Sequence, residues 1–201
     1  MKKDRYPLPH ISDLLDSPQK ARFYTKIELH HAYHLVHIQE GDEWKTSFRT
    51  RYGSFKWRIM PFGLTNAPTA FKHFMNDIFG DLLNVCMLVY LDDILIYSDS
   101  EEEHIQHICE VLRCLQQHNL YTHADKCFFH VQTVEYLGYI LSLSGLTMAA
   151  DKVQVIQDWP EPRKIKDIQS FLGFTNFYRY FIPHYSDIAV PLTHLTRKGS
   201  A

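Results

Sequence analysis

Apolar and polar positions follow patterns that predict short strands and amphipathic helices along most of the chain. Residues 22–28 alternate loosely and are rich in β-forming side chains, which predicts a strand. Residues 44–50 and 54–60 flank a Tyr-Gly-Ser turn and predict a hairpin. Over residues 67–82 the apolar positions recur at three- and four-residue steps, which predicts a helix that is buried on one face and capped by Asn66.

A second hairpin and a second helix follow. Residues 85–90 and 94–97 are short apolar strands separated by Leu-Asp-Asp. Ser100 and Glu103 form a capping box at the start of the next helix. The predicted apolar face of that helix consists of Ile105, Ile108, Leu112 and Leu115.

The strand signals end near residue 150. Residues 134–140 and 146–148 predict one more hairpin around a Ser-Gly turn. Helical patterns bounded by prolines follow over residues 151–158, 164–173 and 174–181. The order of strand, hairpin, helix, hairpin and helix favours an α+β sheet with helices on one face over a doubly wound parallel sheet. We therefore expect a small helical subdomain from about residue 150.

Composition supports a folded chain without membrane segments. The 201 residues are 45% hydrophobic and 14% aromatic, which excludes wholesale disorder and suits one domain with a small appendage. No apolar run approaches the ~20 residues that cross a bilayer, and the first residues lack the apolar stretch of a signal peptide. The four cysteines form no Cys-x-x-Cys pair, so reduced thiols in an intracellular compartment are expected.

The overall charge is nearly balanced, but one segment is basic. The net charge is −2, which does not resemble that of a strongly basic nucleic-acid binder. Residues 44–58 nevertheless contain five basic and five aromatic side chains and no acidic one. This segment is either a hairpin with one solvated, charged face or a surface that binds nucleic acid.

Two adjacent carboxylates interrupt an apolar stretch at Asp92 and Asp93. A buried pair of like charges is costly, so these residues are either turn aspartates at a hairpin tip or ligands of a divalent cation. A cation site needs a third acid. Glu28, which ends a predicted strand, is the best candidate, although such a residue is more often a surface acid or a helix start.

The motifs together resemble the reverse transcriptases of gypsy-type LTR retrotransposons, which are related to retroviral reverse transcriptases. The matching blocks occur in the family's order from about residue 5 to residue 196. They are Arg5-Tyr-Pro-Leu-Pro9, Phe23-Tyr-Thr-Lys-Ile-Glu-Leu29 with Ala32-Tyr33, residues 44–53, Met60-Pro-Phe-Gly-Leu-Thr-Asn-Ala-Pro68, Tyr90-Leu-Asp-Asp-Ile-Leu-Ile96, Glu135-Tyr-Leu-Gly-Tyr-Ile140 and residues 171–179.

This resemblance implies a right-hand polymerase fold and an RNA-directed DNA polymerase activity. Residues 1–149 would form the palm with part of the fingers, and residues 150–201 would begin the helical thumb. The enzyme would add dNTPs to a primer 3′ end with two Mg²⁺ ions, for which Mn²⁺ is a substitute. The implied location is the cytoplasm, within a retroelement particle, with the nucleus as an alternative.

The resemblance also assigns the catalytic and nucleotide-binding residues. Glu28, Asp92 and Asp93 match the catalytic, metal-binding acids, and the carbonyl of Leu29 would complete the metal site. Tyr33 matches the steric gate that selects dNTPs, and the alternative interpretation is a core tyrosine. The residues implied in dNTP binding are Leu29, His30, His31, Ala32, Tyr33 and Phe62, with the backbone amides of residues 30–33 facing the triphosphate.

Nucleic acid and the rest of the polyprotein are the implied partners. The template would be RNA or DNA with a primer, held by Pro61, Gly63, Tyr90, Leu91, Lys126, Leu137, Gly138 and Tyr139. Residues 137–139 resemble the primer grip. The upstream fingers, the connection and the ribonuclease H of the Pol polyprotein would be further partners, and no membrane is expected.

Two departures from the family pattern lead us to expect impaired synthesis. Glu28 stands where the family has aspartate, and a misplacement of ~1 Å can cost ~10²-fold in rate. The basic fingers residues that clasp the triphosphate would lie upstream of this sequence. The alternative function is a decayed or non-catalytic palm domain that binds nucleic acid or a protein partner. The histidines at positions 30, 31, 34 and 37 could form a metal cluster, although the acids account for the chemistry without one.

Overall fold

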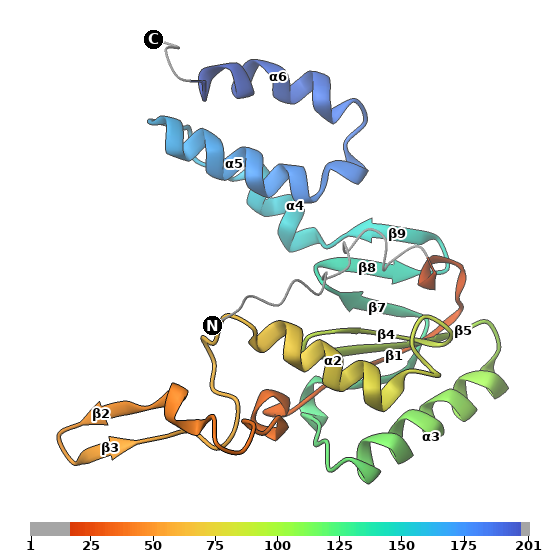
Figure 1. Cartoon of the computed structure of the whole chain (residues 1–201). Coiled ribbons are helices and arrows are strands. Elements are labelled where there is room, and N and C mark those ends of the chain that lie inside the picture. Colours follow the sequence, from red (N-terminus) through yellow and green to blue (C-terminus); the bar gives the residue numbers. More distant parts are fainter. Residues whose placement is uncertain (1–16, 198–201) are drawn as a thin grey trace. The chain divides into compact units, whose positions relative to one another are not determined.

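The computed structural model describes residues 17–197, so the motif at residues 5–9 lies outside the described part (Figure 1). The chain divides into two compact units. The first comprises the described residues up to Tyr136 together with Leu141–Gly145. The second comprises Leu137–Ile140 and the described residues from Leu146 onward. No helix between residues 17 and 197 is long and apolar enough to span a membrane.

An antiparallel sheet of four strands forms the centre of the first unit. Its order is β4 (Met87–Tyr90), β5 (Asp93–Ser98), β1 (Phe23–Glu28) and β6 (Phe128–Val131). β1 and β5 pair without a register shift, whereas a bulge interrupts the pairing of β1 with β6. The predicted strand at residues 22–28 and the predicted hairpin at residues 85–97 are thereby confirmed.

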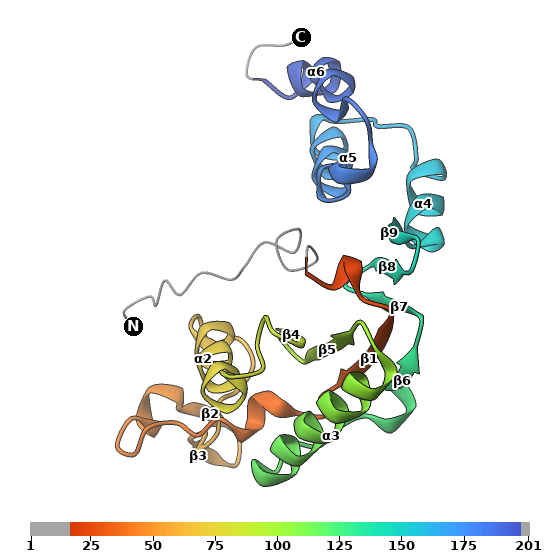
Figure 2. The ribbon, with the colours of Figure 1, turned by 90° about the vertical axis from the view of Figure 1, so that its right-hand side faces the viewer.

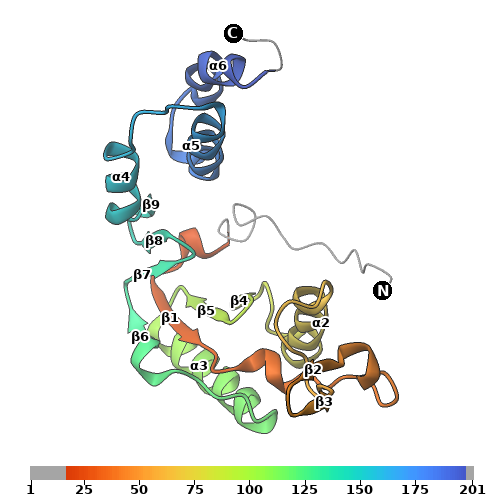
Figure 3. The same ribbon diagram turned by 90° about the vertical axis from the view of Figure 1, so that its left-hand side faces the viewer.

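Helices α2 (Ala67–Phe79) and α3 (Glu101–Gln117) cover one face of this sheet (Figures 2 and 3). Alternate residues of a strand point to the same face, and Ile27, Ile94 and Ile96 all point toward these helices. They share one buried core with Phe71, Met75, Phe79, Val111 and Leu115. Asn66 occupies the predicted N-cap position of α2, but its side chain forms no capping hydrogen bond.

The predicted apolar face of α3 was correct at Ile108 and Leu115, which pack in the core, but wrong at Ile105 and Leu112. Ile105 is 51% exposed and Leu112 is 39% exposed, whereas His104 is completely buried. The buried face of α3 comprises His104, Val111 and Leu115. His104 is buried because its ring hydrogen-bonds Thr25 on β1 and Ser98 on β5.

The predicted hairpin of residues 44–60 is present but shorter. Its strands are β2 (Phe48–Thr50) and β3 (Gly53–Phe55), and η3 (Glu43–Thr46) replaces the first part of the expected strand. All residues of β2 and β3 are exposed, and the hairpin projects from the sheet in Figure 1. The remaining short 3₁₀ helices of the first unit are η1 (Pro18–Lys20), η2 (Ala32–Leu35) and η4 (Ala124–Lys126).

A second sheet follows the first along the chain. It consists of β7 (Thr133–Tyr136), β8 (Tyr139–Ser142) and β9 (Gly145–Met148), in that order. The single strand expected at residues 134–140 was therefore wrong. Leu137 and Gly138 adopt positive φ angles of 54° and 82°, which form a turn and divide this segment into two strands.

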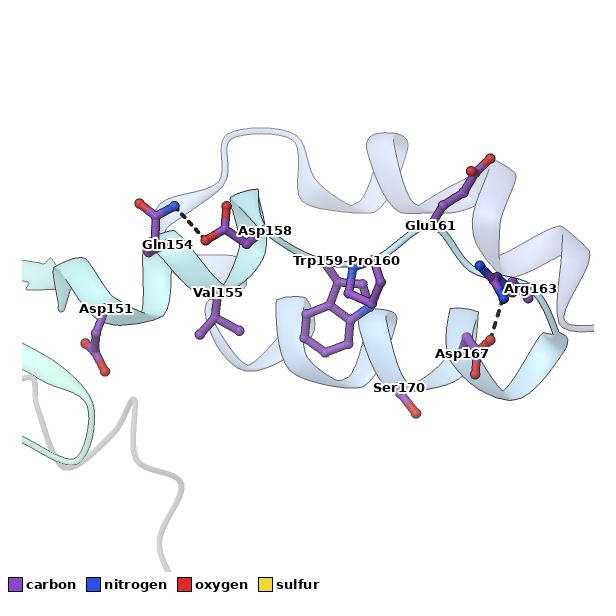
Figure 4. A pocket seen from close by; sticks show the side chains of 10 residues that line it. All are labelled: Asp151, Gln154, Val155, Asp158, Trp159, Pro160, Glu161, Arg163, Asp167 and Ser170. Carbon is purple, nitrogen blue, oxygen red and sulfur yellow. Dashed lines mark hydrogen bonds between the residues drawn. The ribbon is translucent and has the colours of Figure 1, made fainter.

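The second unit is mainly helical. It contains α4 (Ala150–Gln157), α5 (Ile165–Phe177), η5 (Arg179–Phe181) and α6 (Tyr185–Leu195), and α5 packs against α6. The helices expected at residues 164–173 and 174–181 are instead one helix, α5, followed by a 3₁₀ turn. A groove of about 870 Å³ lies beside α4 and α5, with Trp159 in its middle (Figure 4).

Candidate active site

The β4–β5 hairpin places Asp92 and Asp93 at the end of the central sheet. Tyr90 pairs with Asp93 across the hairpin, so Leu91 and Asp92 form the turn. Leu91 adopts a left-handed conformation with φ 53°. The amide of Leu29 donates to the carbonyl oxygen of Asp92 at 2.8 Å, which ties the turn to the end of β1.

Glu28 lies directly opposite Asp93 in the β1–β5 pairing. Side chains of directly opposed residues in an antiparallel pair point to the same face, with Cβ atoms about 5 Å apart. This face is opposite to the one that α2 and α3 cover, because Ile27 and Ile94 point toward those helices. The register therefore brings together two acids that are far apart in the sequence.

The pKa values of both aspartates are raised, as expected for buried carboxylates that lie near other carboxylates. Burial raises the pKa of Asp92, and the negative charges of Asp93 and Glu28 raise it further. Burial also raises the pKa of Asp93, but the ammonium group of Lys26 opposes this shift. One carboxylate oxygen of Asp92, Oδ1, is buried and has no hydrogen-bond partner. These three acids are thus close enough to interact, and Asp92 has an unsatisfied oxygen.

Two lysines neutralise the other two acids. Lys126 Nζ lies 2.6 Å from Glu28 Oε1, and Lys26 Nζ lies 3.7 Å from Asp93 Oδ1. The Glu28 contact is a charge-assisted hydrogen bond, which raises the pKa of Lys126. Lys26 was not predicted, although its position two residues before Glu28 on a strand places both side chains on the same face.

The carboxylates suit a magnesium ion chemically, but their arrangement is not a ready metal site. Hard carboxylate oxygens are ligands that Mg²⁺ prefers, and one of them, Asp92 Oδ1, is buried without a hydrogen-bond partner. Within residues 17–197, however, no group of three His, Cys, Asp or Glu side chains is placed to hold a metal ion. The histidine cluster that we considered as an alternative is likewise not placed to hold a metal ion in this part of the chain. Glu28 and Asp93 each contact a lysine instead.

All predicted nucleotide-binding residues except Phe62 follow β1 directly. Tyr33, in η2, is 6% exposed, and its ring stacks on Phe71 with centroids 4.6 Å apart. Phe62 is 66% exposed, and its ring centroid lies 5.2 Å from that of Tyr33. Tyr33 is therefore a core residue in this structure, and its role as a steric gate stays a prediction.

Histidines gather beside these residues. The ring of His30 lies 4.0 Å from that of His31 and 4.3 Å from that of His123, measured between centroids. Burial, followed by the neighbouring His31 and His123, lowers the pKa of His30. The amide of His30 donates to the carbonyl of Tyr121 at 2.7 Å, so this amide does not face a triphosphate as we expected. No local sequence signal connects His123 with β1.

The predicted nucleic-acid-binding residues are distributed over both units. Tyr90 and Leu91 belong to the hairpin with the acids, and Pro61 and Gly63 flank Phe62 in the loop before α2. Leu137, Gly138 and Tyr139 belong to the second unit. There the hydroxyl of Tyr139 donates to the carbonyl of Phe177 at 3.3 Å. Lys126 contacts Glu28, so its predicted contact with nucleic acid stays a prediction.

A helix-backed antiparallel sheet with an acidic hairpin at its end is the architecture of a polymerase palm. The chain belongs to the reverse transcriptase family, because the family model described as "Reverse transcriptase (RNA-dependent DNA polymerase)" matches residues 1–141. The chain is 39% identical over 198 residues to the Transposon Tf2-3 and Tf2-4 polyproteins of Schizosaccharomyces pombe. These matches cover 98% of this chain but only 15% of each polyprotein.

Solved structures agree with this assignment. The foamy viral protease-reverse transcriptase in complex with an RNA/DNA hybrid is 25% identical, with a TM-score of 0.86 over 97% of this chain and 26% of that one. The same enzyme in complex with double-stranded DNA, in a form designated dRH, has a TM-score of 0.89 at 25% identity, over 96% of this chain and 34% of that one. The expected α+β, palm-like polymerase fold is confirmed.

Proposed function

We propose that this chain is a fragment of the Pol polyprotein of a gypsy-type LTR retrotransposon and that it adds dNTPs to a primer 3′ end. The observation that carries the proposal is the pairing of Glu28 with Asp93, which places acids from separate motifs on one face beside Asp92. In this proposal residues 1–149 are the palm with partial fingers, and residues 150–201 begin the thumb. Its site of action is a retroelement particle in the cytoplasm.

The acids would hold the metal ions of the family's mechanism. Glu28, Asp92 and Asp93, with the carbonyl of Leu29, are the residues that would bind two Mg²⁺ ions, or Mn²⁺ in their place. When bound, such ions lower the pKa of the primer hydroxyl and neutralise the charge of the triphosphate. In-line phosphoryl transfer needs positioning more than covalent help. The fixed β1–β5 register supplies that positioning to Glu28 and Asp93.

Tyr33 and Phe62 would form the wall beside the incoming nucleotide. Tyr33 is held by its stacking on Phe71, so its ring cannot move away without disturbing the core. A rigid ring at this position would collide with a 2′-hydroxyl group and select deoxynucleotides. Phe62 is exposed beside it and would contribute an apolar contact.

A template–primer duplex is the partner that the matched structures support. The foamy viral enzyme was solved with an RNA/DNA hybrid and with double-stranded DNA. In this chain a groove of about 850 Å³ runs between residues 36–46 and the start of α2, and Trp44 and Lys45 contribute to its lining. An exposed tryptophan and a lysine suit base stacking and phosphate contact, so this groove is where we place the template.

One observation favours the alternative of a palm that binds nucleic acid without synthesis. Lys126 forms an ion pair with Glu28, and Lys26 forms one with Asp93. The extra methylene group of Glu28, compared with aspartate, also moves its carboxylate by about a bond length. Reduced catalysis is the expected result. The exposed basic hairpin would still bind phosphates.

Primer extension on an RNA template tests the proposal. With Mg²⁺ and dNTPs, Asp92→Asn should extend the primer at below about 1% of the unsubstituted rate, because even a 1 Å misplacement costs ~10²-fold. Asp77→Asn is the matched control, since Asp77 is an exposed aspartate on α2. Extension that is equal in the Asp92→Asn and unsubstituted chains would contradict the proposal. If neither chain extends a primer but both bind the hybrid, the non-catalytic alternative holds.

A further inference from the structure

The Glu28–Lys126 contact is built into the backbone. Lys126 ends η4, whose first turn is closed by the hydrogen bond from the Lys126 amide to the carbonyl of His123 at 3.0 Å. The amide of His123 in turn donates to the carbonyl of Glu28 at 2.9 Å. Two backbone hydrogen bonds therefore connect Lys126 to the residue that its side chain contacts.

The longer side chain of glutamate matters to this contact. The Nζ–Oε1 distance is 2.6 Å, and the Glu28 side chain is 26% exposed against 51% for Lys126. An aspartate at position 28 would have a side chain that is shorter by one methylene group.

An ammonium group and a divalent cation compete for the same carboxylate oxygen. Two cations within about 4 Å repel each other, and the hydrogen bond to Lys126 uses lone-pair density that a metal ion needs. Asp92, by contrast, has an unpartnered buried oxygen. Residues 17–197 contain no group of three side chains that is placed to hold a metal ion, and one of the three neighbouring acids, Glu28, contacts Lys126.

We propose that Lys126 is a competing cation, and that a divalent metal ion binds at Glu28, Asp92 and Asp93 by displacing the Lys126 ammonium group from Glu28. This inference rests on the proposed function, because it concerns the metal ions of that site. It adds a step to metal binding: the Lys126 side chain leaves Glu28 before the carboxylate is a ligand. Lys26 has the same relation to Asp93, but at a longer distance of 3.7 Å.

Mn²⁺ binding to the 201-residue chain without nucleic acid tests this inference. Free Mn²⁺ is measured by its electron paramagnetic resonance signal during a titration. Lys126→Met should bind Mn²⁺ roughly two- to five-fold more tightly, as expected from removing one partly exposed ion pair. Lys126→Arg keeps the cation and should not bind more tightly. Lys166→Met removes an exposed lysine on α5 and controls for net charge.

A double-substitution experiment separates competition from general charge. In a Glu28→Gln background the ion pair is already absent, so adding Lys126→Met should change the Mn²⁺ dissociation constant by less than about two-fold. An unchanged dissociation constant for Lys126→Met, or an equal effect of Lys166→Met, would overturn the inference.

The failure of the proposed function has a different signature. If Asp92→Asn abolishes Mn²⁺ binding but Lys126→Met does not change it, the metal site is supported and only the competition by Lys126 is rejected. If Asp92→Asn does not change Mn²⁺ binding either, the metal site itself is rejected, and the proposed mechanism with it.

Discussion

Glu28 ends a strand and contacts Lys126, and the sequence pattern could predict the first of these properties but not the second. Its strand position was predictable, because residues 22–28 alternate and end at an acid. Its partner Lys126 lies 98 residues away and reaches it only through the folding of η4 against β1. Motif matching therefore located the acids but not the cations that neutralise them.

Shortening Glu28 should improve catalysis. In a longer piece of the polyprotein that includes the upstream fingers, we expect Glu28→Asp to raise kcat by up to ~10²-fold. KM should change less, because the gain is felt mainly in the transition state. Mn²⁺ should partly rescue the glutamate form. Steady-state kinetics on a primed RNA template check this, and an unchanged kcat would place the impairment elsewhere.

Tyr33 should serve both stability and selectivity. Because its ring is buried and stacked on Phe71, we expect Tyr33→Ala to lower the free energy of unfolding by about 3 kcal/mol, as measured by urea denaturation. The same variant should reduce the ratio of kcat/KM for dNTPs over rNTPs. Tyr33→Phe keeps the ring and should preserve both quantities. A lower stability with unchanged selectivity would make Tyr33 a core residue only.

At the scale of elements, α3 shows where apolar periodicity misleads. The pattern predicted Ile105 and Leu112 on the buried face, but both are exposed and His104 is buried instead. His104 is buried because Thr25 and Ser98 each hydrogen-bond one of its ring nitrogens, at 2.9 Å in both cases. A buried polar residue that is fully hydrogen-bonded is tolerated in a core, and its partners cannot be identified from spacing along one helix.

The burial of His104 should make stability depend on pH. Burial lowers the pKa of His104 from 6.5 to about 4 in the folded chain. As the pH falls, the His104 ring therefore takes up a proton in the unfolded chain before it does so in the folded chain. Stability is then full above pH 6.5 and is lost as the pH falls toward 4, by about 2 kcal/mol at pH 5. The raised pKa values of Asp92 and Asp93 act in the opposite direction.

Urea denaturation at pH 7 and pH 5 measures this dependence. His104→Gln should flatten it, whereas His118→Gln, at an exposed histidine, should leave it as it is. The Asp92→Asn variant lacks the opposing contribution of Asp92, and equal stability of this variant at both pH values would contradict this account of His104.

The turn at Leu137 and Gly138 is a second element that the sequence pattern concealed. Apolar residues continue through the turn, so the segment looked like one strand. A Cβ atom at Gly138 would lie 2.9 Å from the hydroxyl oxygen of Tyr178. The glycine is thus required both by its φ of 82° and by its close neighbour.

Gly138→Ala should destabilise the chain more than Gly145→Ala does. Both glycines have positive φ, but no atom lies within 4 Å of a Cβ at Gly145. We expect a cost of about 1 kcal/mol at Gly145 and more at Gly138. Adding Tyr178→Phe removes the hydroxyl group and should restore part of the difference. Equal melting temperatures for the two alanine variants would contradict the close contact.

At the scale of the whole molecule, the order of the motifs carried most of what the sequence could predict. The α+β class, the acidic hairpin and the reverse transcriptase family all followed from it. Helix α6 was not predicted, because Pro191 lies inside it. The last predicted helix ended at residue 181. The chain spans 15% of the length of the curated polyproteins that it matches, so the activity of the complete protein stays a proposal.

The most direct measurement is the position of Mn²⁺ in crystals of this chain, located by anomalous diffraction. Our account predicts a metal peak within roughly 2.5 Å of carboxylate oxygens of Asp92 and Asp93, with Lys126 moved off Glu28. Peaks that lie only elsewhere, or no peak at these aspartates, would contradict the claim that the three acids form a metal-dependent polymerase site.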